Sequence, residues 1–195
     1  MAATDKQSTE ARSTPKKAPG GARAKAAAKR KSSTGTSTAK SATAGEQDAV
    51  QLLMADHREV AAMFERFEQL DDDDQKMEVA ENICLALTVH TQIEEEIFYP
   101  AFLKATKDKD LNDEAIVEHQ AAKNLIAQIE GMEASEDLYD AKVKVLGEEI
   151  EHHVKEEEQK DGMFDEAKKA KMDLKDLGRR MAARKEELMA ELAGD

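Results

Sequence analysis

His90-Thr-Gln-Ile-Glu94 and His153-Val-Lys-Glu-Glu157 share one spacing, in which a histidine is followed four residues later by a glutamate. On an α-helix, residues four apart lie one above the other, so each pair directs an imidazole nitrogen and a carboxylate oxygen at one point. The repeated spacing therefore predicts two helices that each coordinate a metal ion through a histidine and a glutamate. Two more histidines, His57 and His119, stand alone in other segments of helical periodicity.

Around these motifs, the sequence from residue 47 onward has the composition of a helical domain. It is rich in Ala, Leu, Met, Glu, Lys and Gln, has one proline, Pro100, and lacks the alternation of β-strands. Apolar periodicity predicts helices at about 47–70, 75–105, 112–130 and 135–160. We expect Asn112 or Asp113 to open the third helix, Ser135 to cap the fourth, and Pro100 to kink or shorten the second. Short loops join antiparallel neighbours, so the predicted fold class is all-α, an antiparallel up-down-up-down four-helix bundle.

Residues 163–195 are predicted to add one highly charged C-terminal helix, at about 165–193. Apolar residues recur in it at near-heptad spacing: Leu174, Leu177, Met181, Leu188 and Leu192. This narrow apolar seam favours docking along the bundle over pairing with a second copy of the chain.

Residues 1–46 contain no Val, Leu, Ile or Phe. Such a segment cannot bury enough apolar surface to offset its ordering entropy, so we expect a disordered tail. Its ten Lys/Arg and three Asp/Glu carry +7, whereas the 19 basic and 39 acidic residues of 47–195 carry −20. A basic tail on an acidic body can fold back on it, make a weak contact with nucleic acid, or only be solvated. The expected organisation is a tail (1–46), a bundle (47–162) and a charged helix (163–195).

The sequence carries no membrane or export signal of the usual kinds. No apolar run of signal-peptide length follows the start, and no 18-residue apolar span occurs, so we expect a cytoplasmic protein without membrane contact. The single cysteine, Cys84, excludes an internal disulfide and fits a reducing compartment. We expect Cys84 to be a small buried residue of a helix. The expected oligomeric state of the protein is a monomer or a dimer.

The apolar stripes of the helices indicate which titratable side chains point inward. His153 continues an apolar stripe and leads to Glu157, whereas His152 continues a more polar stripe. By the same argument Glu94, rather than either of the two glutamates after it, lies beneath His90. We therefore expect His153 and Glu157 inside the bundle and His152 at the helix boundary.

Six inward residues then form the candidate metal ligands: His57, His90, Glu94, His119, His153 and Glu157. A lone histidine on an apolar face is usually a hydrogen-bonded core residue. Four histidines and two carboxylates in a neutral core, however, would have no partners to compensate for their burial. A bound cation removes this penalty. No thiolate joins the set, and six nitrogen or oxygen ligands exceed the need of one tetrahedral zinc. Two ions that share both carboxylates use the whole set, and iron suits it; a mononuclear site and manganese stay open.

At these residues the chain resembles the hemerythrin family in its bacterial HHE cation-binding form, over about residues 48–192. The resemblance is carried by Asp56-His57, His90-Thr-Gln-Ile-Glu94-Glu-Glu-Ile-Phe-Tyr-Pro100, Glu118-His119 and His152-His153-Val-Lys-Glu-Glu157-Glu. It implies a four-helix bundle around a non-haem di-iron centre with an oxo or hydroxo bridge. By position, the six residues above would be its ligands, and Glu94 and Glu157 would bridge the ions. The implied ligands are O2, peroxide or nitric oxide, with a role in oxidative stress.

One departure from the family bears on function. Oxygen-carrying hemerythrins have a second histidine one turn after that of the third helix, and here Lys123 occupies that position. One iron would lack a nitrogen ligand, and water, Tyr99 or another oxygen donor could fill the position, or it could stay open for substrate. This favours peroxide or nitric oxide chemistry over oxygen carriage, and we name no separate catalytic residue. Tyr99 is either a hydrogen-bond donor or, as is more common, an aromatic residue of the bundle boundary beside Pro100. The alternatives are an iron or redox sensor that signals through the C-terminal helix or the tail, and a metal storage or structural bundle.

Overall fold

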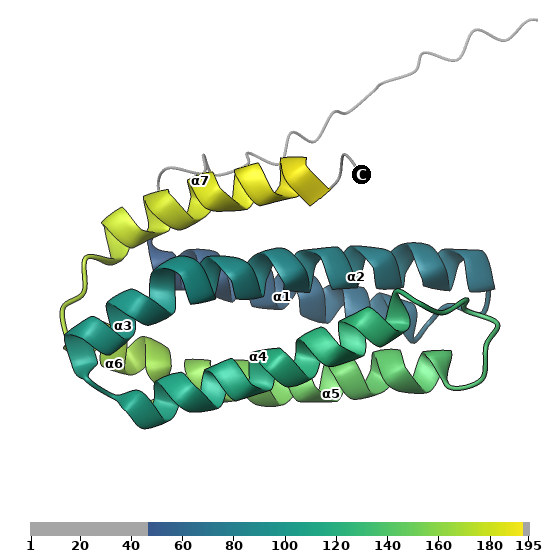
Figure 1. Ribbon diagram of the computed structural model, residues 1–195, viewed down its shortest axis with the longest axis horizontal. Coiled ribbons are helices and arrows are strands. Elements are labelled where there is room, and N and C mark those ends of the chain that lie inside the picture. The colour runs from purple at the N-terminus through teal and green to yellow at the C-terminus, as the bar shows by residue number, and fades with distance from the viewer. Residues whose placement is uncertain (1–46, 193–195) are drawn as a thin grey trace, which may run out of the picture. The chain divides into compact units, whose positions relative to one another are not determined.

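The computed structural model describes residues 47–192, and this part of the chain is helical throughout, with no β-strand. Its elements are α1 (Ala49–Phe67), α2 (Asp73–Ile93), the π-helical segment η1 (Glu94–Phe98), α3 (Tyr99–Thr106), α4 (Lys109–Ile129), α5 (Tyr139–Glu158), α6 (Met163–Lys169) and α7 (Leu174–Leu192) (Figure 1). The predicted disordered tail, residues 1–46, lies outside the described residues.

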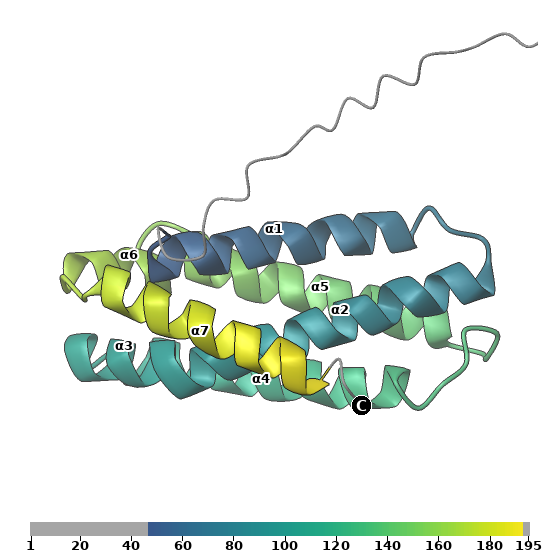
Figure 2. The ribbon, with the colours of Figure 1, turned by 90° about the horizontal axis from the view of Figure 1, so that it is seen from above.

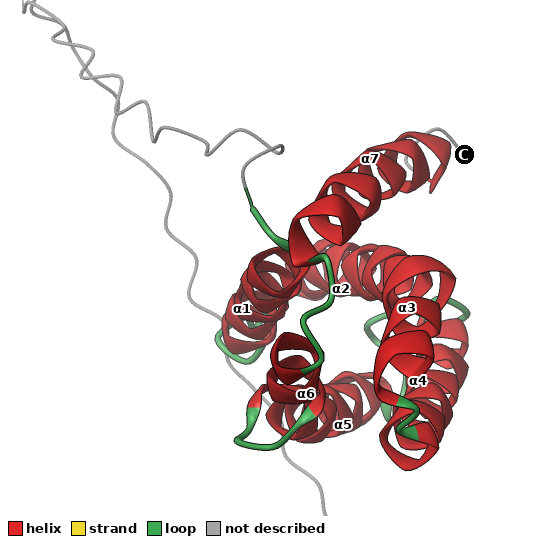
Figure 3. Ribbon diagram, turned by 90° about the vertical axis from the view of Figure 1, so that its left-hand side faces the viewer, coloured by secondary structure: helices red, strands yellow, loops and turns green. Residues whose placement is uncertain are grey.

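Four long helices of the described part surround one core. Seen from the end, α1, α2, α4 and α5 follow one another around a ring, and each packs on the next (Figure 3). α3 continues α2 through η1, and α6 covers the same end of the bundle. The predicted all-α four-helix bundle is confirmed.

Two hydrophobic clusters occupy opposite ends of this bundle. The first is built around Phe98, Phe102 and Phe164 from η1, α3 and α6. The second includes Phe67 at the C-terminal end of α1 and Tyr139 at the N-terminal end of α5. α1, α4 and the rod of α2, η1 and α3 contribute to both clusters, and α5 leads from the second cluster to α6 in the first. The buried polar residues lie between the two clusters. The fold therefore places a polar layer between two apolar ones.

Helix starts differ from the sequence-based expectation in α4 and α5. α4 begins three or four residues earlier than predicted, because the Asp108 carboxylate accepts the backbone N–H of Leu111 as its N-cap. The predicted cap of the fourth helix, Ser135, is wrong, since α5 begins only at Tyr139. Residues 133–138 instead form turns, in which the Glu136 side chain accepts the backbone N–H of Glu133. Local hydrogen bonding by acidic side chains here competes with helix formation.

The second predicted helix is one continuous rod whose hydrogen-bond ladder changes at Glu94. The backbone N–H of Tyr99 donates to the carbonyl oxygen of Glu94, five residues back, as in a π-helix. Pro100, the next residue, has no N–H to donate, and the wider turn accommodates it without ending the rod. Because residues five apart stack in a π turn, Tyr99 lies on the same side as Glu94.

The predicted C-terminal helix is present as α7, but it begins later than the predicted residue 165, because residues 163–169 form a separate short helix, α6. Lys171 adopts a left-handed backbone conformation, with φ of 55°, between the two helices. α7 then runs back across α1 and α2 (Figure 2). Leu177, Met181 and Leu188 of the predicted seam are buried there, which confirms docking along the bundle.

Gly178 lets α7 approach the start of α1 closely. A Cβ atom at this position would lie 2.5 Å from the carbonyl oxygen of Gln47 and 2.8 Å from the backbone nitrogen of Ala49.

No helix in the described part of the chain is long and apolar enough to cross a membrane. Cys84 is buried in α2, as expected.

Candidate metal centre

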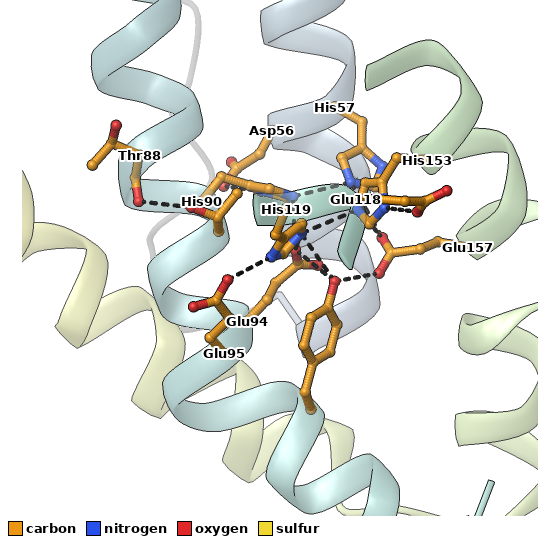
Figure 4. A network of polar contacts seen from close by, with 12 residues as sticks. Asp56, His57, Thr88, His90, Glu94, Glu95, Glu118, His119, His153 and Glu157 are labelled. Carbon is orange, nitrogen blue, oxygen red and sulfur yellow. Dashed lines mark hydrogen bonds and ion pairs between the residues drawn. The ribbon is translucent and has the colours of Figure 1, made fainter. Parts of the chain in front are cut away.

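The six predicted ligands meet in the polar layer at the middle of the bundle (Figure 4). His57 comes from α1, His119 from α4, and the two His-x-x-x-Glu pairs from α2–η1 and α5. All six are buried, with exposed fractions between 0% and 6%. By contrast, the side chain of His152 is 61% exposed, so the inward orientation predicted for His153 is confirmed.

The four histidines form two close pairs through their Nε2 atoms. These atoms lie 3.2 Å apart in the pair His57–His90 and 3.3 Å apart in the pair His119–His153. Two ligand atoms that are each about 2.1 Å from one ion, at a right angle, lie about 3 Å apart. Each pair thus has the spacing of two neighbouring ligands of one ion.

Each glutamate of the centre lies between the two histidine pairs. Oε2 of Glu94 is 3.2 Å from Nε2 of His90 and 3.3 Å from Nε2 of His119. Oε2 of Glu157 is 3.6 Å from Nε2 of His57 and 3.7 Å from Nε2 of His153. Both carboxylates therefore contact one histidine of each pair.

A second set of carboxylates, which we term the outer carboxylates, faces the Nδ1 atoms. The pairs and their Nδ1–oxygen distances are His57–Glu158 (2.9 Å), His90–Asp56 (3.6 Å), His119–Glu95 (3.0 Å) and His153–Glu118 (2.8 Å). Each outer carboxylate belongs to the preceding helix of the ring and adjoins an inner residue in sequence. The sequence analysis did not identify this set. On each of the four helices, however, an acidic residue stands next to an inner residue, and this pattern could have indicated the outer carboxylates.

The outer carboxylates decide which imidazole nitrogen carries the proton. Where a carboxylate accepts from Nδ1–H, Nε2 keeps its lone pair and points it into the centre. The Nδ1–oxygen distances of 2.8–3.0 Å establish this for three histidines, while the 3.6 Å contact to Asp56 is longer than a hydrogen bond. Lone pairs of paired imidazoles would repel one another unless a cation or a proton lay between them.

Unpartnered buried atoms mark the same place. Oε1 of Glu94 and Oε2 of Glu157 have no hydrogen-bond partner within residues 47–192. Leaving a buried polar group unpaired costs about 1–3 kcal/mol, and more if it is charged. A cation at the centre would satisfy these atoms and the converging lone pairs, so the donor set fits a metal.

The pKa values of the bare cluster show the same imbalance. Burial and the nearby charge of Glu94 raise the pKa of Glu157 to about 8. Burial also acts on Glu94, but His90 and His119 outweigh it and hold its pKa well below the usual range. Burial and the charge of His90 lower the pKa of His57 to about 4. A bound metal ion would displace the protons that these groups bind with very different pKa values.

Tyr99 is buried directly beside the two glutamates, so it is not an aromatic residue of the bundle boundary. Its hydroxyl oxygen is 3.3 Å from Oε2 of Glu94, 3.1 Å from Oε1 of Glu157 and 3.1 Å from Nε2 of His119. Burial and the two carboxylates raise the pKa of the phenol well above its usual value. The hydroxyl therefore keeps its proton.

Lys123 does not point into the centre. Its Nζ atom lies 2.6 and 2.7 Å from the two carboxylate oxygens of Glu95, which also accepts from Nδ1 of His119. The residue at the family's additional histidine position thus supports an outer carboxylate.

A small cavity of about 10 Å³ adjoins the centre. All four histidines line it, together with the apolar side chains of Val60, Leu87, Ile150 and Val154. A cavity of this size holds about one water-sized molecule. A larger surface hollow of about 390 Å³, between α1 and α5, shares no lining residue with the centre.

The sequence and the fold are similar to those of known proteins. The sequence model of the hemerythrin HHE cation binding domain matches residues 48–164. A DNA nickase of Nostoc sp. is 29% identical over 112 residues, which cover 57% of this chain and 31% of that protein. An uncharacterised hemerythrin-like protein of Schizosaccharomyces pombe is 26% identical over 114 residues, which cover 57% of this chain and 56% of that protein. The chain thus spans less than two thirds of either relative.

A solved structure shares the fold. The crystal structure of a hemerythrin HHE cation binding domain-containing protein from Mycobacterium kansasii superposes with a TM-score of 0.59 and 20% identity, covering 74% of this chain and 89% of that one. The sequence match covers more than half of the chain, and the His/Glu cluster is able to bind metal. The chain therefore belongs to the hemerythrin HHE cation-binding domain family.

Proposed function

We propose that this protein holds a non-haem di-iron centre that binds or reduces O2, peroxide or nitric oxide. The observation that carries the proposal is the convergence of four imidazole Nε2 atoms and two carboxylates in one buried layer, with polar atoms left unpartnered. The ligands would be the six residues predicted from sequence, His57, His90, Glu94, His119, His153 and Glu157. Nitrogen and oxygen donors without a thiolate suit iron.

The pairing of the ligands supports two ions rather than one. One group of candidate ligand atoms comprises His57, His90 and Glu94, and another comprises Glu94, His119 and His153. Glu94 belongs to both groups, and Glu157 contacts a histidine of each pair. This supports one ion at each histidine pair, with both glutamates shared between them.

Iron held there would supply electrons and an open coordination position for a small oxidant. The chain's own residues exclude water and hold a proton nearby. Tyr99 keeps a proton on its hydroxyl between Glu94 and Glu157, where it can donate to a reduced oxygen species. The cavity that the four histidines and four apolar side chains line has room for about one small molecule. These features favour reduction of peroxide or O2 over its reversible carriage.

Metal analysis combined with absorption spectroscopy tests the proposal. Purified protein should contain iron and show near-ultraviolet bands of an oxo-bridged ferric pair, and the iron form should consume peroxide. His153→Ala should lose iron and activity, since it removes one inward nitrogen. Colourless protein with stoichiometric zinc would contradict the redox function.

A sensor function is the second candidate, because α7 contacts the outer carboxylates. Nζ of Lys185 lies 2.6 Å from Oδ1 of Asp56, whose other oxygen faces Nδ1 of His90 at 3.6 Å. Arg184 also contacts Glu96 of η1 at 2.8 Å. A change of charge at the centre would reach α7 through these ion pairs. If this is the function, removing iron should change protease cleavage within residues 165–193 while peroxide is not consumed.

A nucleic-acid contact through residues 1–46 is a further proposal about partners. It rests on the +7 charge of this segment and on the similarity to a protein named DNA nickase. Each phosphate neutralised by a lysine or arginine releases a counterion, so retention on DNA should weaken steeply with salt. A chain that lacks residues 1–46 and is retained equally well would contradict it.

A further inference from the structure

Two of the four outer carboxylates are each held by a lysine on the side that faces away from the centre. Nζ of Lys123, on α4, lies 2.6 and 2.7 Å from the two carboxylate oxygens of Glu95. Nζ of Lys185, on α7, lies 2.6 Å from Oδ1 of Asp56. Two helices that are far apart in the sequence thus supply the same contact to two different outer carboxylates.

The other two outer carboxylates have weaker basic neighbours. Nη2 of Arg58 is 4.0 Å from Oε2 of Glu158, and Nε2 of His152 is 3.6 Å from Oε1 of Glu118. The side chains of this arginine and this histidine are 64% and 61% exposed, against 38% and 31% for the two lysines. Water and salt screen exposed pairs strongly, so the lysines carry most of the positive charge that acts on the outer carboxylates.

Both lysines act on the same side of the centre. The carboxylates that they hold face Nδ1 of His90 and of His119. These are also the two histidines whose Nε2 atoms lie 3.2 and 3.3 Å from Oε2 of Glu94, whereas the other two face Glu157. Each histidine pair therefore has one member whose outer carboxylate is paired with a lysine.

The two lysines also balance the charge of a loaded centre. Two inner and four outer carboxylates carry −6 when all are ionised. Two ferrous ions would contribute +4 and the two lysines +2, so these charges would cancel. Without either lysine, one negative charge would be in excess, and a nearby negative charge stabilises the ferric ion more than the ferrous ion.

We propose that Lys123 and Lys185 are positioning residues that hold the outer carboxylates Glu95 and Asp56 and raise the reduction potential of the centre. The inference rests on the proposed function, because it requires iron in the centre. Each lysine acts on the iron through its carboxylate and the histidine that this carboxylate faces. A higher potential favours the ferrous state, in which iron has electrons to give to a small oxidant.

The test measures the midpoint potential of the iron-loaded full-length chain by spectroelectrochemistry, at the near-ultraviolet bands of the ferric pair. Lys123→Met and Lys185→Met should each shift the midpoint to a lower potential, and the double variant should shift it further. Lys123→Arg keeps the positive charge and should stay near the wild type. Lys109→Met is the matched control on α4, because it removes an exposed lysine that pairs with Asp113, and it should leave the midpoint unchanged.

The outcomes separate this inference from the proposed function. If both methionine variants bind iron and keep the wild-type midpoint, the inference is refuted while the di-iron centre stands. An equal shift in Lys123→Arg and Lys123→Met would also refute it, since the charge would not be the cause. Loss of iron from both methionine variants would refute it as well, because the lysines would then hold the ions rather than set their potential. If the wild type retains no iron, the proposed function fails and the inference fails with it.

Discussion

Replacing Glu158 should weaken metal binding although the residue is not among the six proposed ligands. Its Oε1 atom accepts from Nδ1 of His57 at 2.9 Å, and this contact keeps the Nε2 lone pair of His57 directed inward. Loss of such an outer partner reduces metal affinity by about 10-fold to 100-fold, or about 1.4–2.7 kcal/mol. Glu158→Gln keeps a carbonyl acceptor and should lie near the lower value. Glu158→Ala lets the ring rotate and change tautomer, so it should lie near the upper value.

Competition with a chromophoric chelator measures this affinity for ferrous iron in the absence of oxygen. Glu148→Gln is the matched control, because it removes the same charge from α5 at a site 65% exposed and paired with Lys144. The order of affinity should be wild type and Glu148→Gln, then Glu158→Gln, then Glu158→Ala. If Glu158→Ala binds iron as tightly as the control, the outer carboxylates do not orient the histidines.

Three further predictions follow from other parts of the structure. Gly178→Ala should destabilise the protein by about 1–3 kcal/mol in urea unfolding, because its Cβ would meet the Gln47 carbonyl oxygen at 2.5 Å; an unchanged midpoint would contradict the close approach. Tyr99→Phe should retain iron but consume peroxide about a hundredfold more slowly, whereas Tyr139→Phe, which changes the other tyrosine far from the centre, should match the wild type; equal rates would remove the proton-donor role. In the metal-free protein, Glu157 has a pKa raised from 4.5 to about 8, so its contribution to stability is present below pH 4.5 and lost as the pH rises through 8. The stability of Glu157→Gln relative to the wild type should therefore increase over this range in urea unfolding, and a constant difference would show that burial does not perturb the carboxyl.

The inward positions were predictable because they depend only on helical periodicity. His153 continues an apolar stripe and His152 does not, and their burial follows that distinction. The Lys123 position illustrates what periodicity leaves out. Its contact with Glu95 depends on the rotation and spacing of two helices, which no pattern within one helix specifies. The same reason hid all four outer carboxylates, whose partners belong to the next helix of the ring.

Helix ends were the weakest predictions, since they depend on a balance of local interactions. Ser135 has the residue type of an N-cap, yet turns stabilised by Glu136 delay α5 to Tyr139. The break between α6 and α7 was also missed, because Lys171 adopts positive φ without being a glycine. Pro100 was expected to kink or shorten the second helix, whereas the rod continues through it by a π turn. That this turn places Tyr99 beside Glu94 is a tertiary outcome.

The ratio of iron to protein chain in the purified protein tests the central claim most directly. Elemental analysis against an amino-acid quantitation gives this ratio without assuming any activity. Two histidine pairs that share Glu94 and Glu157 predict about two irons per chain. A ratio near one would contradict the shared-carboxylate arrangement, and a chain without iron after anaerobic loading with ferrous iron would contradict the metal centre itself.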